Sequence, residues 1–547
     1  MKSVHSLYIT VVLLVVCFFA FFVNNGALLP DIMESRNIIT AREMVYDGNW
    51  AVPTMNGDLR LEKPPLPTWF AALAEIIAPD SIPVQRAMSG FAACLLVLAF
   101  FKLGALIFNS NTKAFISALV LCTCYNVVLQ GRTATWDIYT YSFMLLAIWQ
   151  IVRGFWKKSG FGVHFLLAGV FMGLSFLSKG PIALYGLFLP FIITFFFVYY
   201  PRLEGKGKAI FLMIFLSVVI GFSWYAFIYA FHPEAMAEVA ARESANWANH
   251  NVRPFWYYWD FFLEAGVWAA ILIFAISMIF WSKKHRHVEG YMVPFIWMFL
   301  ALILLSIPGE KKTRYLFPMM IPISYLIGFF IYEMQDVFDS RKDYILERFI
   351  FKLNGWIITI ASFALPAVLY FIAVRKSYLE WFPFIMISII CIGVGVYLVI
   401  QMRLYRPVGL VYGVVALFIG AEVFALPITR NVIQNPRMKS ISATYDHPEL
   451  KDIPFRYNSA DELRIEMVYR AHKKIRPVDV NSVDSLKNAL PFVILTHKSV
   501  KEELDPAIFK YADTTFLGAF DDNLHPESDR HYTNNLKYNA TLLTPKH

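Results

Sequence analysis

Long apolar runs recur through the first 427 residues, and they constrain the fold more than any other feature. A helix needs about twenty apolar residues to cross the hydrocarbon core of a bilayer. About thirteen segments meet this criterion: residues 6–28, 86–108, 113–130, 136–153, 161–178, 181–200, 209–231, 257–281, 291–307, 314–333, 351–375, 383–401 and 408–427. Segments that cross lipid must satisfy their own backbone groups, as helices do. The sequence therefore predicts an all-α polytopic membrane protein over this region.

The composition argues against a water-soluble alternative. Of the 547 residues, 58% are hydrophobic and only 16% are charged, whereas soluble domains are about a quarter charged. The net charge of +9 does not indicate nucleic-acid binding, because the basic residues lie in short clusters between apolar runs. All five cysteines lie within apolar runs, which favours packing over disulfide or thiolate metal chemistry.

The basic clusters predict an orientation. Lys and Arg concentrate on alternate loops, including residues 153–158, 202–208 and 283–286, and such clusters mark the cytoplasmic side. The amino terminus is then cytoplasmic, and an odd number of spans places the carboxyl terminus outside. The outside loops are residues 29–85, 131–135, 232–256, 308–313 and 376–382.

Composition changes after Pro427. The remaining chain is polar, with strand-like runs at residues 491–496 and 515–520 and helical periodicity at 460–472. This mixture predicts a soluble α/β domain. We therefore divide the chain into two domains: a transmembrane domain, residues 1–428, with outside loops 29–85 and 232–256, and an α/β domain, residues 429–547.

The polar run from Met33 to Trp69 is predicted to form half of an active site. Its charges alternate with aromatic residues and prolines, a composition unlike that of a flexible linker. Residues 34–46 have the pattern of an amphipathic helix at the membrane surface. The prolines that follow restrict the backbone around Glu62 and Lys63.

A second outside loop, residues 309–314, carries three cations where the positive-inside pattern predicts few. Lys311, Lys312 and Arg314 can bind a phosphate, the lysines as point charges and the arginine through its guanidinium fork. Contact with lipid headgroups or nearby acidic residues is the alternative.

Several motifs in these segments resemble one family. They are Arg42-Glu43-Met44, Gly48-Asn49-Trp50, Pro53, Asn56-Gly57, Glu62-Lys63-Pro64-Pro65-Leu66 with Trp69, Arg132-Thr133-Ala134 with Asp137, Lys179-Gly180-Pro181, and Lys312 to Pro318 around Tyr315. Together they resemble the bacterial aminoarabinose transferases, which are polyprenyl-phosphate-sugar-dependent glycosyltransferases of the GT-C fold, and they are similar to protein mannosyltransferases. The resemblance covers nearly the whole chain and implies a GT-C-like bundle with a periplasmic α/β tail.

The resemblance implies an integral-membrane glycosyltransferase of the bacterial inner membrane. Such an enzyme moves a sugar from a polyprenyl-phosphate donor to a lipid A or LPS-type glycolipid at the periplasmic face, by inverting displacement. A protein acceptor, as in the mannosyltransferases, is the alternative within the enzyme class. A transporter or lipid flippase would place ionisable residues near the bilayer midplane, whereas the notable charges here lie at one face.

The candidate catalytic residues depart from the family pattern. Members typically carry an Asp-Glu pair at the head of the first loop helix, and here the matching pair is Met33-Glu34. Asp137, at the outer end of a predicted span, becomes the first candidate, with Glu34 second; an ion pair with Arg132 is the other interpretation of Asp137. A hydroxyl acceptor requires such a carboxylate base, whereas a phosphate acceptor does not.

The leaving phosphate gains negative charge, so the site requires cations and hydrogen-bond donors around it. The candidates for this role are Lys63, Arg36, Lys312, Arg314, Tyr315 and Arg242. A headgroup contact is the alternative for Arg242, which stands alone in its loop.

The resemblance also implies a zinc ion held by Glu62 together with histidines. The second large outside loop offers His250, which does not align clearly with the family's ligands. One carboxylate and one imidazole are a weak metal signal, so no cofactor is firmly predicted and a divalent metal near Glu62 is a hypothesis. An ion pair of Glu62 with Arg60 or Lys63 is the alternative.

Overall fold

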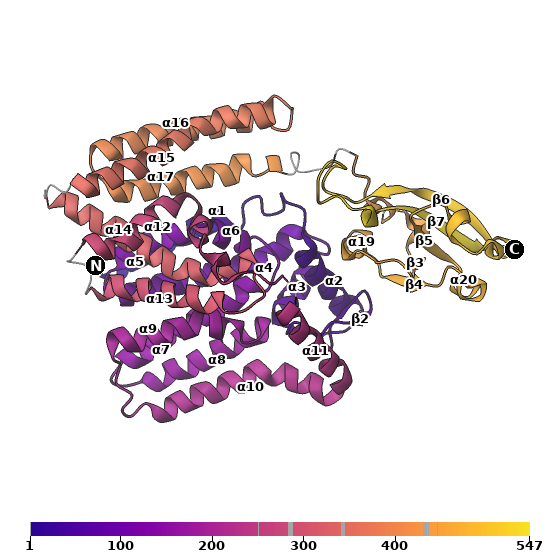
Figure 1. The fold of residues 1–547 in the computed structure, drawn as a ribbon, viewed down its shortest axis with the longest axis horizontal. Helices are drawn as coiled ribbons and strands as arrows, with labels where there is room; N and C mark the ends of the chain where they lie inside the picture. The colour runs from indigo at the N-terminus through magenta and orange to yellow at the C-terminus, as the bar shows by residue number, and fades with distance from the viewer. Residues whose placement is uncertain are drawn as a thin grey trace. The chain divides into compact units, whose positions relative to one another are not determined.

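The computed structural model describes residues 2–249, 251–282, 288–340, 345–429, 435, 437–445 and 447–546. The chain forms two compact units, which we call the helical unit and the sheet unit. The helical unit comprises Met1–Ala27 and Leu61–Ile428, and the sheet unit comprises Leu28–Arg60 and Thr429–His547. Figure 1 shows the long helices of the first unit and the strands of the second.

The helical unit is built from long helices interrupted by short 3-10 and π turns. Its α-helices are α1 (Lys2–Phe21), α3 (Leu66–Ile77), α4 (Ile82–Ile107), α5 (Asn111–Leu121), α6 (Tyr125–Gly131), α7 (Asp137–Trp156), α8 (Phe161–Lys179), α9 (Leu189–Tyr199), α10 (Gly207–Phe231), α11 (Pro233–Asn249), α12 (Ala269–Trp281), α13 (Glu289–Ser306), α14 (Met320–Asp339), α15 (Ile345–Leu369), α16 (Trp381–Arg403) and α17 (Pro407–Gly420). The turns are η1 (Leu184–Phe188), η2 (Phe255–Tyr258), η3 (Phe261–Trp268), η4 (Thr313–Met319), η5 (Tyr370–Val374) and η6 (Ala421–Ala425).

Each predicted apolar run coincides with a helix or a pair of helices, so the prediction of an all-α polytopic protein is confirmed. Over the described residues, nine helices are long and apolar enough to cross a membrane, and the pair α5–α6, bent by 73°, makes up to ten. This count is lower than the sequence predicted. α1 and η1–α9 contribute shorter apolar stretches, and α7, which carries Asp137, is not among the nine.

Glycines explain how α8 is held against its neighbour. α7, α8 and α10 lie side by side (Figure 1). A Cβ at Gly169 would approach the Met213 carbonyl oxygen to 2.6 Å, and one at Gly173 would approach Ile220 to 2.7 Å. Small residues four positions apart share a helix face and let two backbones approach closely in lipid. This packing fixes the helix whose last residue is Lys179.

The sheet unit confirms the predicted α/β domain. Its elements are α2 (Ile32–Tyr46), β1 (Thr54–Met55), β2 (Asp58–Leu59), η7 (Ile441–Thr444), η8 (Pro448–Leu450), β3 (Phe455–Asn458), α19 (Ile465–Ala471), β4 (Ile475–Val478), α20 (Val483–Ala489), β5 (Phe492–Thr496), α21 (Val500–Glu503), η9 (Pro506–Lys510), β6 (Ala512–Asp521), η10 (Asn534–Leu536) and β7 (Lys537–Pro545). The main sheet has the order β4-β3-β5-β7-β6. β3 pairs in parallel with β4 and β5, whereas β7 pairs antiparallel with β5 and β6.

The first outside loop divides between the two units, whereas the sequence predicts that all of it belongs to the transmembrane domain. Its helix α2 and the hairpin β1–β2 pack within the sheet unit. The Asn56 amide donates to the Ile475 carbonyl at 2.7 Å and accepts from the Ile475 N–H at 2.8 Å. The Arg42 guanidinium donates to the Tyr469 carbonyl at 2.7 Å. Asn56 thus binds the free edge of β4 as a neighbouring strand would.

We expect Asn56→Ala to lower the free energy of unfolding of the sheet unit by about 2–3 kcal/mol. Two buried hydrogen bonds are lost, and Asn56 has a φ of 57°, a left-handed conformation that costs alanine about 1 kcal/mol. Asn56→Gly avoids that strain and should cost about 1–2 kcal/mol. Both stability losses are measured by unfolding the full chain with denaturant in detergent. Protease cleavage of the first loop reports the unfolded fraction. Wild-type stability in Asn56→Ala would contradict the proposed anchor.

Candidate functional site

A buried ion pair lies where α7 begins and α8 ends. The Lys179 Nζ is 2.6 Å from the Asp137 Oδ1, and the two side chains are only 8% and 5% exposed. The carboxylate lies at the N-terminus of α7 and the ammonium at the C-terminus of α8, which suits both helix dipoles. Asp137 therefore pairs with Lys179 and not with Arg132, whose guanidinium lies 2.9 Å from the Glu422 carboxylate.

Three cations surround the ring of Tyr315, which lies in η4. The Lys179 Nζ is 5.5 Å from the ring centroid, the Arg314 guanidinium carbon is 5.6 Å away and the Lys312 Nζ is 5.8 Å away. The Tyr258 hydroxyl fixes the start of this segment, since it accepts from the Lys312 N–H at 3.0 Å and donates to the Lys312 carbonyl at 3.1 Å. The structure thus brings Lys179 next to three candidates, Lys312, Arg314 and Tyr315, that follow it by 133 residues or more.

The cations of residues 309–314 have different environments. The Lys311 Nζ donates to the backbone carbonyls of Pro308 and Arg253, and burial lowers the pKa of its ammonium. The Lys312 Nζ is 2.6 Å from the Glu310 carboxylate. Arg314 makes no ion pair within the described part of the chain, and its Nε is buried without a hydrogen-bond partner. Arg314 is therefore the cation with capacity for an anionic ligand.

Two further candidate cations, Arg242 and Lys63, contact carboxylates. The Arg242 guanidinium, on α11, contacts the Glu62 carboxylate, and the Lys63 Nζ lies 3.7 Å from the neighbouring Glu243 carboxylate. These side chains are 28–49% exposed, so each pair contributes about 0–1 kcal/mol and can open for a ligand. Arg314 lies over the same tyrosine ring as Lys179, and Lys63 acts electrostatically on Lys179.

The zinc ion at Glu62 stays a prediction. The carboxylate of Glu62 contacts Arg242, and Glu62 is not part of the group of three metal-ligating side chains that the described residues contain, His525, Asp529 and His531. His250 lies outside the described residues. We therefore derive no chemical step through a metal at this position.

Two candidates belong to the sheet unit, so their roles still rest on the sequence alone. Glu34 and Arg36 lie in α2; Glu34 is buried, and the Arg36 carbonyl accepts from the Arg60 guanidinium at 2.8 Å. Asp31 caps this helix by accepting from the backbone N–H groups of Met33 and Glu34, both at 2.8 Å.

Sequence reasoning gave Lys179 no role, although it recognised the Lys179-Gly180-Pro181 motif. The sequence did carry a signal. Lys179 ends the largely apolar helix α8 and is followed by Gly180 and Pro181, which stop the helix. A lysine at the end of a membrane span needs a partner for its charge. The contact of Tyr258 with Lys312 was also missed, because the two residues are 54 positions apart.

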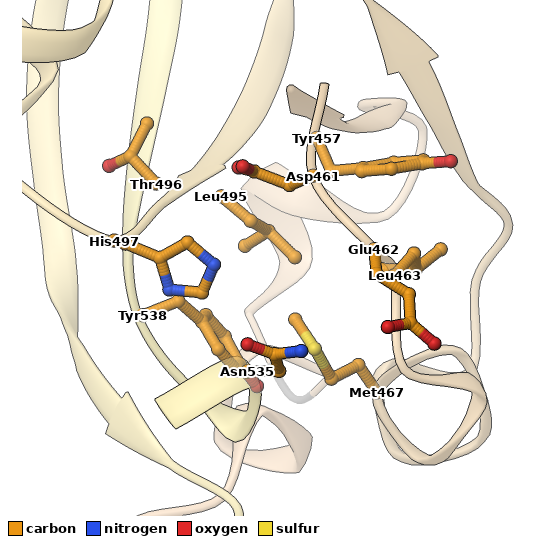
Figure 2. A pocket seen from close by; sticks show the side chains of 10 residues that line it. All are labelled: Tyr457, Asp461, Glu462, Leu463, Met467, Leu495, Thr496, His497, Asn535 and Tyr538. Carbon is orange, nitrogen blue, oxygen red and sulfur yellow. The ribbon is translucent and has the colours of Figure 1, made fainter. Parts of the chain in front are cut away.

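The sheet unit contains a pocket of different chemistry. Figure 2 shows its lining, which includes Tyr457, Asp461, Glu462, His497 and Tyr538. Two of its lining side chains are carboxylates and none is a lysine or arginine. This pocket does not suit a phosphate, and the cation cluster of the helical unit remains the candidate site.

Comparisons with known proteins show what the chain is similar to. Residues 62–230 match the family described as dolichyl-phosphate-mannose-protein mannosyltransferase, and this range contains Glu62, Lys63, Asp137 and Lys179. The undecaprenyl phosphate-alpha-4-amino-4-deoxy-L-arabinose arabinosyl transferase 1 of Pseudomonas fluorescens is 24% identical over 74% of this chain and 70% of its own length. The corresponding transferase of Aeromonas hydrophila is 27% identical over 60% of this chain and 59% of its own length.

A solved structure extends the likeness to the whole fold. The crystal structure of ArnT from Cupriavidus metallidurans bound to undecaprenyl phosphate superposes with a TM-score of 0.68 at 14% identity, covering 99% of this chain and 98% of that one. The apo structure of the same protein gives a TM-score of 0.65. The chain is thus a multi-pass membrane protein with a GT-C-like fold and an α/β domain.

Proposed function

We propose that this chain, a GT-C-fold relative of the aminoarabinose transferases and protein mannosyltransferases, is a glycosyltransferase that uses a polyprenyl-phosphate-linked sugar. The acceptor in this proposal is a glycolipid of the lipid A type. The observation that carries the proposal is the cation cluster: Lys179, Lys312 and Arg314 lie around the ring of Tyr315, and Lys179 pairs with the Asp137 carboxylate. Lys63 acts electrostatically on the same Lys179.

The cluster fits the charge that develops when the donor is cleaved. An acceptor oxygen forms a bond to the anomeric carbon from the face opposite the phosphate, and the bond from that carbon to the phosphate oxygen breaks. The electron pair leaves with the phosphate, which changes from a singly charged diester to a monoester of about −1.5 to −2. Fixed cations stabilise such developing charge. Arg314 has the most capacity for this role, because it makes no ion pair among the described residues and its Nε is buried without a partner. Lys63 is second, because its partly exposed pair with Glu243 can open.

The buried pair bears on the acceptor. One oxygen of the Asp137 carboxylate is already bound by Lys179, and Asp31 is occupied as a helix cap. An acceptor hydroxyl requires a carboxylate that can take its proton. An acceptor phosphate is already ionised and requires none, so the arrangement favours a phosphorylated glycolipid. In this proposal Asp137 positions Lys179, and it becomes the base only for the alternative protein acceptor.

The proposed location is the bacterial inner membrane, with the amino terminus in the cytoplasm and the sheet unit in the periplasm. The alternating basic loops of the sequence support this orientation. It places the catalytic cluster at the periplasmic face, where the activated donor needs no nucleotide.

Mass spectrometry of envelope lipids tests the proposed acceptor. We expect a deletion strain to lose a sugar substituent from its lipid A fraction, and a plasmid copy of the gene to restore it. A plasmid copy carrying Lys63→Ala is the matched control for catalysis, and it should restore little or none. Unchanged lipid A together with lost glycoprotein modification would overturn the glycolipid acceptor and favour the protein.

A further inference from the structure

The loop between β6 and β7 gathers three side chains that the proposed transferase chemistry does not use. His525, Asp529 and His531 place one ligand atom each within 4.8 Å of the others. The His531 Nδ1 is 2.8 Å from one oxygen of the Asp529 carboxylate, and the His525 Nδ1 is 3.7 Å from the other oxygen. A hydrogen bond between Asp529 and His531 does not explain why the imidazole of His525 also lies beside the same carboxylate.

The loop is closed by bonds that do not involve these three side chains. The Asn523 side chain, only 1% exposed, donates to the Thr533 carbonyl at 2.9 Å and accepts from the Thr533 N–H at 2.9 Å. Inside this closure the Asp529 N–H donates to the Pro526 carbonyl at 2.9 Å, and the Tyr532 N–H donates to the Asp529 carbonyl at 3.0 Å. The three side chains are therefore held on a preformed turn.

We propose that this closed loop binds a divalent transition metal, with zinc as the expected ion, through His525, Asp529 and His531. Zinc bonds of about 2.1 Å in a tetrahedral site place neighbouring ligand atoms about 3.4 Å apart. One ligand atom from each side chain lies within 4.8 Å of the other two, so side-chain rotations that move these atoms by about 1 Å complete the geometry.

The donor set selects the kind of ion. Two imidazoles and one carboxylate suit zinc and other first-row transition metals, whereas magnesium and calcium prefer oxygen ligands. The three side chains are 36–57% exposed, so an ion can enter from solvent and water can fill the fourth position. Binding would fasten the loop onto strands β6 and β7. This inference is independent of the proposed transferase activity.

Calorimetric titration of the full chain in detergent, purified without a polyhistidine tag, tests the site with zinc alone. We expect one equivalent to bind, with about tenfold or greater loss of affinity in His525→Ala and in His531→Ala. The matched control is His497→Ala, which removes another exposed histidine of the sheet unit and should leave binding unchanged. Absent binding, equal affinity in all variants, or equal binding of magnesium would each overturn the proposal.

A second readout does not depend on heat of binding. Arg530 is exposed and lies between two of the proposed ligands, so trypsin can cleave the loop after it. Zinc should slow cleavage at Arg530 in the wild type and in His497→Ala, and a chelator should restore it. Equal protection of His531→Ala by zinc would contradict the assignment.

Discussion

Replacing Arg314 with alanine is expected to lower kcat/KM for the polyprenyl-phosphate donor about 100- to 1,000-fold, the effect of removing one preorganised donor from a developing oxyanion. Arg314 is singled out because its Nε is buried without a partner, whereas Lys311 and Lys312 are engaged by backbone carbonyls and by Glu310. Its guanidinium also lies over Tyr315, which limits its motion. The measurement is transfer of labelled sugar by the purified protein.

Arg314→Lys separates charge from geometry. Lysine keeps the positive charge but not the planar fork, so we expect an intermediate rate. The matched control is Arg253→Ala, which removes an exposed arginine that also stacks on a tyrosine and should change the rate less than about threefold. Wild-type rates in Arg314→Ala, with folding intact, would remove Arg314 from the site and leave Lys63 as the main phosphate ligand.

The sequence predicted the membrane fold well because its physical cause is local. A run of apolar residues long enough for a bilayer specifies a helix by itself, and each predicted run coincides with helical structure. The α/β domain was predictable for a similar reason, since β5 and β6 contain the alternating or apolar runs at residues 491–496 and 515–520.

Partnerships between distant residues were not predictable in the same way. Lys179 is 42 positions from Asp137, and Arg242 is 180 positions from Glu62, so neither pairing follows from local spacing. The sequence instead suggested Arg132 for Asp137 and Arg60 or Lys63 for Glu62. Only the packing of α7 against α8, and the position of α11, select the actual partners.

The grouping of α2 with the sheet unit was also unpredictable, because it depends on contacts between residues that are distant in the chain. Residues 34–46 carry an amphipathic pattern, and the sequence alone assigned its apolar side to the membrane surface. In the structure Ile39 of this helix joins the core of the sheet unit with Met467, Val468 and Ala471 of α19. An amphipathic pattern predicts that the apolar face of a helix is covered, but it does not identify whether lipid or another part of the protein covers it.

The buried pair between Asp137 and Lys179 should give the largest loss of stability. Lys179→Met leaves a buried carboxylate without its cation, and we expect a cost of about 3–5 kcal/mol in the free energy of unfolding. Asp137→Asn leaves the ammonium with a neutral partner and should cost somewhat less. The double variant removes both charges, so its cost should fall well below the sum of the two single costs. Thermal unfolding in detergent measures all three.

The double variant also separates two roles for Lys179. If Lys179 only neutralises Asp137, the double variant regains both stability and sugar transfer. Our proposal that Lys179 belongs to the phosphate-binding cluster predicts a double variant that folds but transfers sugar at least about tenfold more slowly. The matched control is the Lys113–Glu333 pair, also 2.6 Å apart, because Lys113→Met with Glu333→Gln removes a similar pair between two other helices, α5 and α14. A normal transfer rate in the Asp137→Asn, Lys179→Met protein would assign the pair to folding alone.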